Sequence, residues 1–149
     1  MTSPTFETLA KTTAAAFAGV LAWKWDGRFQ AVVAQFDLSA QEKVRAVLGR
    51  HLGQSWDAQT VSTAPAPIKQ ACAAMGGLQN GQLAFASGTE APFLYGAWWP
   101  WDNGRTVSLR LAARPAAGDD EAPSAFKECF VPPSAVEPVA ARDQGNAKR

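Results

Sequence analysis

The segment that most constrains the fold is a pair of strand-like runs joined by a tight turn, residues 93–111, FLYGAWWPWDNGRTVSLRL. After the turn, apolar and polar residues alternate, which is the period-two pattern of a strand with one buried face. Before the turn, both sets of alternating positions are apolar. Asp102, Asn103 and Gly104 tolerate the positive φ angles that a tight hairpin requires. The segment therefore predicts a β-hairpin whose first strand is apolar on both faces.

Three of the six tryptophans of the chain lie in this hairpin, at Trp98, Trp99 and Trp101. We expect Trp99 in the core, because a buried indole removes on the order of 150–250 Å² from water. Trp98 has the opposite parity to Trp99 and Trp101 and is hard to bury on the same side as both. A partner contact and a core position are equally supported for Trp98, since aromatic residues are enriched at interface hot spots. Gly96 indicates a bulge or a close approach by another group.

Hydrophobic periodicity predicts three helices and three further strands. The helix starts include Ser3-Pro4 and a capping box formed by Ser39 and Glu42, whereas Asp26-Gly27 predicts the turn of a first hairpin. The helices are expected over 4–18, 38–52 and 63–75, the strands over 20–25, 29–36 and 82–87, and a loop over 54–63.

This element order, α-β-β-α-α-β-β-β, favours an α+β fold with a single five-stranded antiparallel sheet and helices packed on one face. Over about residues 4–113 the order resembles that of PAS-like and of roadblock- or profilin-like domains. The resemblance implies a sheet-and-helix domain and does not imply a function.

A change of composition after residue 113 predicts a domain boundary. Residues 1–113 are expected to form the globular α+β domain, and residues 114–149 a flexible Pro/Ala-rich linker and tail. Within that tail, residues 125–131 form a short apolar island, AFKECFV. Such an island can dock on its own domain or on a partner, and the sequence leaves both possibilities open.

The composition excludes some classes of protein and disfavours others. A net charge of +1 over 149 residues argues against nucleic-acid binding, which needs a concentrated basic patch. Cys72 and Cys129 are widely spaced, which disfavours a disulfide framework or a structural zinc site and favours free thiols in the cytoplasm, although a single bridge between them is possible. Residues 12–23 have the length of a signal-peptide core, yet they follow Glu7 and run into a strand pattern, so we interpret them as part of the domain. No run reaches the ~20 apolar residues of a membrane span.

The sequence contains no catalytic or cofactor signature. His51 is the only histidine, it lies near a predicted helix end, and neither a G-x-S-x-G elbow nor a metal-binding histidine spacing accompanies it. The glycine-rich segment 76–81 follows a helix instead of leading into one, so it lacks the helix N-terminus on which a phosphate loop relies. We therefore assign no catalytic residue, no metal ligand and no cofactor, and we lean against an enzyme.

These features favour a non-enzymatic protein-interaction or accessory module that acts through the Trp-rich hairpin and the apolar tail segment, on a protein partner or a second copy of the chain. One alternative is a small-molecule sensor with a Trp-lined pocket between sheet and helices; a second is an enzyme of unknown class. The candidate binding residues are Trp98, Trp101, Tyr95, Trp23, Trp25, Phe126 and Phe130.

Overall fold

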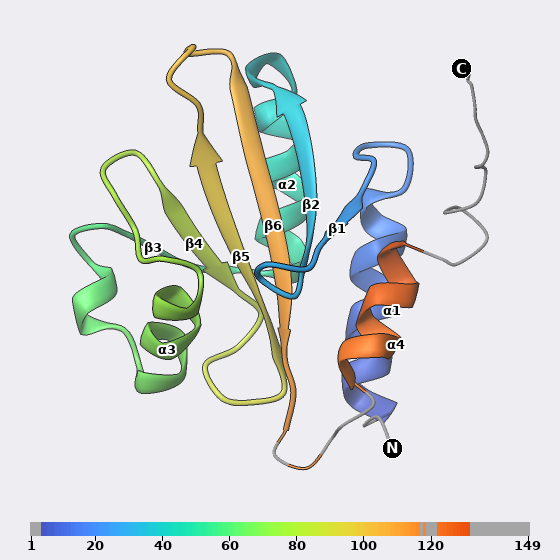
Figure 1. Cartoon of the computed structure of the whole chain (residues 1–149). Coiled ribbons are helices and arrows are strands. Elements are labelled where there is room, and N and C mark those ends of the chain that lie inside the picture. Colours follow the sequence, from blue (N-terminus) through green and yellow to red (C-terminus); the bar gives the residue numbers. More distant parts are fainter. Residues whose placement is uncertain (1–3, 117, 119–121, 132–149) are drawn as a thin grey trace.

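The computed structural model describes residues 4–116, 118 and 122–131 (Figure 1). The expectation of a disordered C-terminal tail concerns residues that are mostly outside this described part. The four helices are α1 (Pro4–Phe17), α2 (Gln41–His51), α3 (Ala66–Ala74) and α4 (Ala122–Phe130), with short 3-10 turns η1 (Leu38–Ala40) and η2 (Val61–Thr63). The strands are β1 (Lys24–Asp26), β2 (Ala31–Asp37), β3 (Gln54–Asp57), β4 (Leu83–Ala86), β5 (Phe93–Pro100) and β6 (Thr106–Arg114).

The strands form one antiparallel sheet in the order β1-β2-β6-β5-β4-β3. The α+β class and the antiparallel sheet are confirmed, but the sheet has six strands, not the predicted five. The additional strand is β3, which comes from the predicted loop over 54–63 and pairs with β4 at the sheet edge. An edge strand is held largely by backbone hydrogen bonds, so its side chains do not have to show the alternating hydrophobic pattern.

Helices cover both faces of the sheet, not one face as predicted. Cross-strand neighbours such as Phe85, Gly96 and Leu111 share one face, and this face carries the core built with α1, α2 and α4. Tyr95 and Ala112 share the opposite face, where they belong to the core built with Ile68 and Cys72 of α3. Both faces of β5 are therefore buried along most of its length, which explains why its sequence is apolar at every position.

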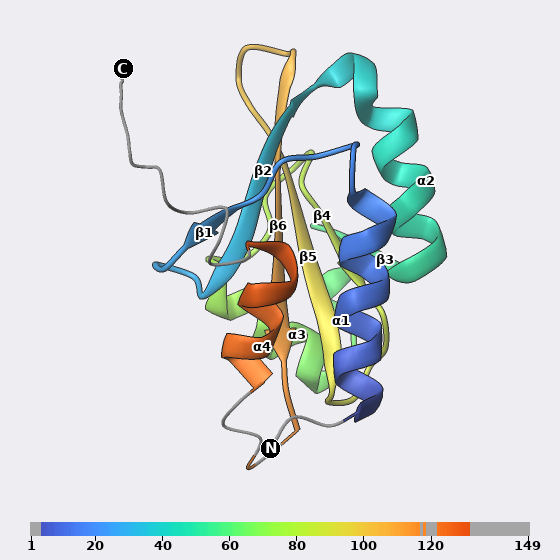
Figure 2. The ribbon, with the colours of Figure 1, turned by 90° about the vertical axis from the view of Figure 1, so that its right-hand side faces the viewer.

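The apolar island after residue 113 forms α4 and packs in cis. Ala122, Phe126 and Phe130 are buried in the same core as α1, and α4 lies beside α1 in both views (Figure 2). Trp23 joins the two helices, since its ring lies 5.4 Å from that of Phe17 and 5.3 Å from that of Phe130. α4 lies beyond the predicted domain boundary at residue 113, yet its apolar residues have the spacing of a helix that packs in the core.

The start of α2 differs from the predicted capping box. Ala40 occupies the N-cap position of α2 and makes no side-chain cap, whereas Asp37 caps the preceding η1 turn by accepting a hydrogen bond from the Ser39 N–H at 2.9 Å. Hydrogen bonds from Ser39 lower the pKa of the Asp37 carboxyl. The helical segment therefore begins where β2 ends, and its cap comes from the last residue of that strand.

Candidate functional site

The face of the sheet that carries α3 is only partly covered. In Figure 1, α3 lies beside β3, β4 and the lower part of β5, and the β5–β6 hairpin extends beyond it. We call the uncovered part the open face, which lies over β1, β2, β6 and the end of β5. Its members are Asp26, Phe29, Val33, Gln35, Trp99, Trp101, Ser108 and Arg110.

Arg110 is at the centre of the open face. Its guanidinium carbon lies 4.5 Å from the centre of the Trp99 ring and 5.4 Å from that of the Phe29 ring. Its Nε donates a hydrogen bond to Asp26 Oδ2 at 3.0 Å, and the Asp26 and Arg110 side chains are only 14% and 12% exposed. Planar guanidinium groups stack on aromatic faces in this way. The arrangement holds two aromatic rings and one neutralised ion pair in a fixed geometry.

The electrostatics of Asp26 favour its charged form. Burial raises the pKa of the Asp26 carboxyl, but the hydrogen bond from Arg110, a second from the Arg28 N–H and both guanidinium charges together lower it further, so the net shift is downward. Asp26 therefore stays ionised and paired at neutral pH.

Trp101 stands at the outer end of the hairpin and is 43% exposed. Its Nε1 donates to the Ser108 hydroxyl at 2.8 Å, and its backbone N–H donates to the Thr106 carbonyl at 2.8 Å. The turn beneath it is held by Asn103, whose Oδ1 accepts hydrogen bonds from the N–H groups of Arg105 and Thr106. A shallow cavity of about 480 Å³ lies beside the ring, lined by residues 100–103. The exposed indole is thus held in one orientation.

Trp99, which was expected in the core, is partly buried at the border between the α3 core and the open face. Its ring meets that of Phe29 edge to face at 5.8 Å, and its Nε1 is buried without a hydrogen-bond partner. A shielded donor without an acceptor costs about 1–3 kcal/mol. Packing against Phe29 and Arg110 therefore outweighs the unmade hydrogen bond.

Trp98, the other candidate contact, is buried, so of the two positions that the sequence left open the structure shows the core position. It is 4% exposed and its ring lies 5.3 Å from that of Phe36 and 6.2 Å from that of Phe85. The guanidinium of Arg45, on α2, lies 5.6 Å from the same ring. The opposite parity of Trp98 places it on the sheet face that carries the core built with α1, α2 and α4, whereas Trp99 lies on the face that carries α3.

The remaining predicted residues are more enclosed than Trp101. Tyr95 is buried beside Cys72 in the α3 core, and this burial raises the pKa of its hydroxyl. Trp23 and Trp25 are partly buried at the β1 edge, where Lys127 Nζ lies 5.0 Å from the Trp25 ring. Phe126 and Phe130 are buried under α4. Of the predicted set, the structure brings only Trp101 to the open face.

Sequence reasoning missed Phe29 and Arg110 as parts of this surface. The alternation over 106–111 does assign Arg110 to the polar side of β6. No sequence signal shows, however, that this side faces Trp99 and Phe29, because that neighbourhood depends on the pairing of β6 with both β5 and β2.

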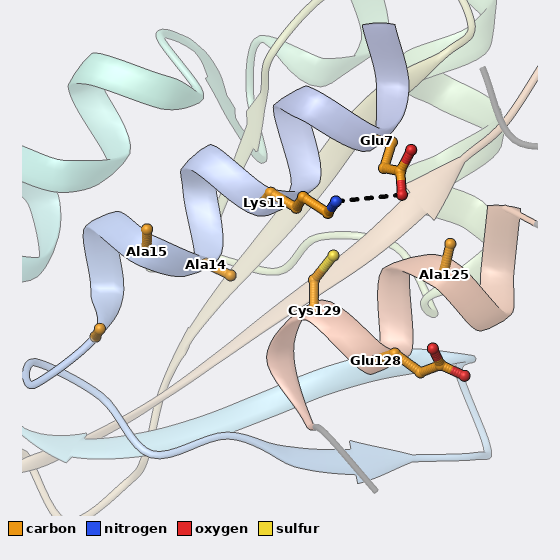
Figure 3. Close-up of a pocket in the computed structure, with 8 residues that line it drawn as sticks. Glu7, Lys11, Ala14, Ala15, Ala125, Glu128 and Cys129 are labelled. Carbon is orange, nitrogen blue, oxygen red and sulfur yellow. Dashed lines mark ion pairs between the residues drawn. The ribbon is translucent and has the colours of Figure 1, made fainter. Parts of the chain in front are cut away.

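A second hollow lies between α1 and α4, with a volume of about 620 Å³ (Figure 3). Its walls carry the Glu7–Lys11 ion pair at 3.4 Å, and its other lining residues are mostly alanines. Cys129 faces it, and burial raises the pKa of this thiol. A raised pKa reduces the thiolate fraction at neutral pH, so this thiol is less nucleophilic than an ordinary cysteine.

The described residues include no group of three or more His, Cys, Asp or Glu side chains with the arrangement of a metal site. His51 lies at the end of α2, as its position in the sequence predicts. Among the described helices, none has the length and hydropathy needed to cross a membrane.

Comparison of the chain with protein-family models, with curated proteins and with solved structures finds no match. The likeness in element order to PAS-like and roadblock- or profilin-like domains therefore stays a prediction.

Proposed function

We propose that this chain is a non-enzymatic protein-interaction module that binds a protein partner through the open face, with Trp101 as the anchor of the contact. The observation that carries the proposal is the exposure of Trp101. Trp101 and Leu38 are the large hydrophobic side chains that the described residues leave exposed, at 43% and 37%. Trp101 is the larger of the two and continues the row of aromatic side chains on the open face.

The composition of the open face supports this proposal. It places tryptophan and phenylalanine rings around one arginine, with the exposed polar side chain of Gln35 beside them. Trp and Arg are enriched among the residues that contribute most to protein–protein binding, and a polar rim commonly surrounds them.

The rigidity of the open face also supports the proposal. Trp101 is tied to Ser108 by its indole N–H, and Arg110 is held between Asp26 and two rings. Side chains that are ordered before binding lose less conformational entropy on association. A pre-ordered aromatic surface is therefore suited to a stable contact.

The experiment compares two single variants of the full chain, Trp101→Ala and Leu38→Ala. Proteins bound to the purified chain, or a second copy of it, are identified by native mass measurement and then tested with each variant. We expect Trp101→Ala to weaken the association at least tenfold, as loss of a hot-spot tryptophan does. Leu38→Ala, which also removes an exposed apolar side chain, should leave it unchanged. Equal affinities of the wild type and Trp101→Ala would contradict the proposal.

A further inference from the structure

Part of β2 lacks a neighbouring strand on its outer side. β1 pairs with β2 only at residues 31–33, whereas β6 pairs with β2 along its whole length. Among the described residues, the outer edge of β2 therefore has no pairing strand from Ala34 to Asp37.

The hydrogen-bond pattern shows which backbone groups of this edge point outward. Leu38 N–H donates to the Arg105 carbonyl at 2.6 Å, and these two residues continue the register of the β2–β6 pair. Successive residues of a strand direct their backbone groups to alternate sides, so Phe36 and Ala34 also face β6. Gln35 and Asp37 face away from β6. Within the described residues Gln35 makes no backbone–backbone hydrogen bond on the outer side, and neither does the N–H of Asp37. The Asp37 carbonyl is at the N-cap of η1, where it accepts the first hydrogen bond of that turn.

There is space beside this free edge. Before β1 the chain leads away from β2 toward the end of α1 (Figures 1 and 2). The opening between them holds a cavity of about 260 Å³ lined by Ala22, Lys24, Val33, Ala34 and Gln35. Gln35, one of the two outward-facing positions, thus lines a hollow that begins where β1 separates from β2.

Charges of opposite sign mark the two ends of the free edge. Lys24 is exposed at the end where β1 separates, and no ion pair to it occurs among the described residues. Asp37 is exposed at the other end, where the charge of Arg105 helps to lower the pKa of its carboxyl. Between them, Phe36 directs its ring to the helix-covered face.

We propose that an extended segment of a partner protein pairs antiparallel with β2 at Gln35–Asp37, carrying in chain order a basic, an apolar and an acidic residue. The basic residue lies opposite Asp37, the apolar residue opposite Phe36, and the acidic residue opposite Gln35 and next to Lys24. Opposite charges and apolar pairs across neighbouring strands stabilise a sheet in this way. Strand addition at a free edge is a recurring mode of peptide recognition.

This inference rests on the proposed function in assigning protein binding, but it uses the backbone edge of β2 and not the Trp101 ring. The two regions meet at Gln35, whose side chain belongs to the open face. Trp101 lies at the hairpin end, whereas the free edge of β2 faces β1. Trp101→Ala should therefore leave peptide binding at the β2 edge unchanged. A failure at either surface can be distinguished from a failure at the other.

The first experiment titrates the full chain, labelled with ¹⁵N, with the blocked synthetic peptide TKVET at millimolar concentration. We expect the amide signals of Gln35 and Asp37 to shift more than those of Ala34 and Phe36, because the first two point toward the peptide. The charge-reversed peptide TEVKT should bind at least several-fold more weakly. Absence of shifts at Gln35 and Asp37, or equal binding of the two peptides, would overturn the proposal.

The second experiment uses Gln35→Pro, which removes the outward N–H. The β2–β6 hydrogen bonds of Ala34 and Phe36 remain, because proline is tolerated at an outward-facing position of an edge strand. We expect Gln35→Pro to lose TKVET binding and Gln35→Val to retain it. Binding that persists in a folded Gln35→Pro variant would refute edge pairing. A dimer in the absence of peptide, with the Gln35 and Asp37 amides protected from exchange, would show that a second copy occupies the edge and would also refute it.

Discussion

Trp98 and Trp101 lie three residues apart in one hairpin, yet their environments are opposite. Trp98 is enclosed by Phe36, Phe85 and Arg45, whereas Trp101 projects from the end of the sheet. Trp98→Ala should lower the free energy of unfolding by about 3–5 kcal/mol, because it leaves a cavity in the core. Trp101→Ala should lower it by about 1 kcal/mol or less, mainly through the lost hydrogen bond to Ser108. Urea denaturation followed by circular dichroism measures both, and similar losses would contradict this assignment.

Gly96 is required by a close approach between β5 and its neighbours. A Cβ at this position would lie 3.0 Å from Leu111 Cδ2 and 3.5 Å from Leu52 Cδ2. Leu111 and Leu52 are fully buried and have little room to move, so Gly96→Ala should destabilise the protein by about 1–3 kcal/mol.

The matched control for this substitution is Gly49→Ala. Gly49 is exposed on α2, and an added Cβ would meet nothing within 4 Å. Alanine in the middle of a helix is favoured over glycine by up to about 1 kcal/mol, so this variant should be more stable. Thermal melts of the two variants should move in opposite directions; a melting temperature of Gly96→Ala at or above that of the wild type would show that the core has room.

Asp26 should make stability depend on pH. Its folded-state pKa lies below the ordinary value of 3.8, so its contribution is fully present above the unfolded-state pKa and is lost as pH falls through the folded-state pKa. Asp26→Asn should therefore be less stable than the wild type by about 1 kcal/mol at neutral pH, and the difference should shrink below about pH 4. Urea titrations at several pH values test this, and a constant difference down to strong acid would refute the assignment to this carboxyl.

At the scale of elements, α4 is the clearest example of a segment whose role depends on packing. Its apolar residues fit the core formed with α1 and Trp23, although they follow a linker-like stretch. A chain ending at Arg114 should therefore melt several degrees lower than the full chain, because it exposes this apolar surface.

A single substitution tests the same contact without removing α4. Phe126→Ala should lower the free energy of unfolding by about 3–5 kcal/mol, whereas Glu128→Ala, on the exposed side of α4, should change it by about 0.5 kcal/mol or less. Chemical denaturation of both variants provides the measurement. If the chain ending at Arg114 and Phe126→Ala both melt like the wild type, α4 does not support the fold.

The elements that the sequence predicts well are those with strong local signals. The first helix and the β5–β6 hairpin lie close to their predicted positions, whereas β1 covers only Lys24–Asp26 where a strand over 20–25 was predicted. β3 was missed because Gln54 and Ser55 are exposed and polar, so the segment has too few buried positions to show alternation. Local hydrophobic patterns identify helices and strands that have a buried face. They do not identify an edge strand that is held mainly by backbone hydrogen bonds.

For the molecule as a whole, the asymmetry of the two helical layers determines which part of the sheet stays uncovered. α1, α2 and α4 cover one face of the sheet, whereas α3 covers part of the other and leaves the open face beside it. An aromatic surface on an otherwise covered sheet is the type of patch that marks an interaction site. The candidate site therefore follows from incomplete coverage of the sheet.

The sequence by itself determined the α+β class, the antiparallel hairpins and most helix positions. These depend on residue periodicity and turn chemistry, which act over a few neighbouring residues. Only the tertiary structure decided that Trp98 is buried and Trp101 exposed. Residue parity separates the two faces of a strand, but it does not show which helix covers each face. The tertiary structure also brought Arg110 to Phe29 and Trp99 and left the β2 edge free at Gln35, because these neighbours meet through strand pairing between segments far apart in the chain.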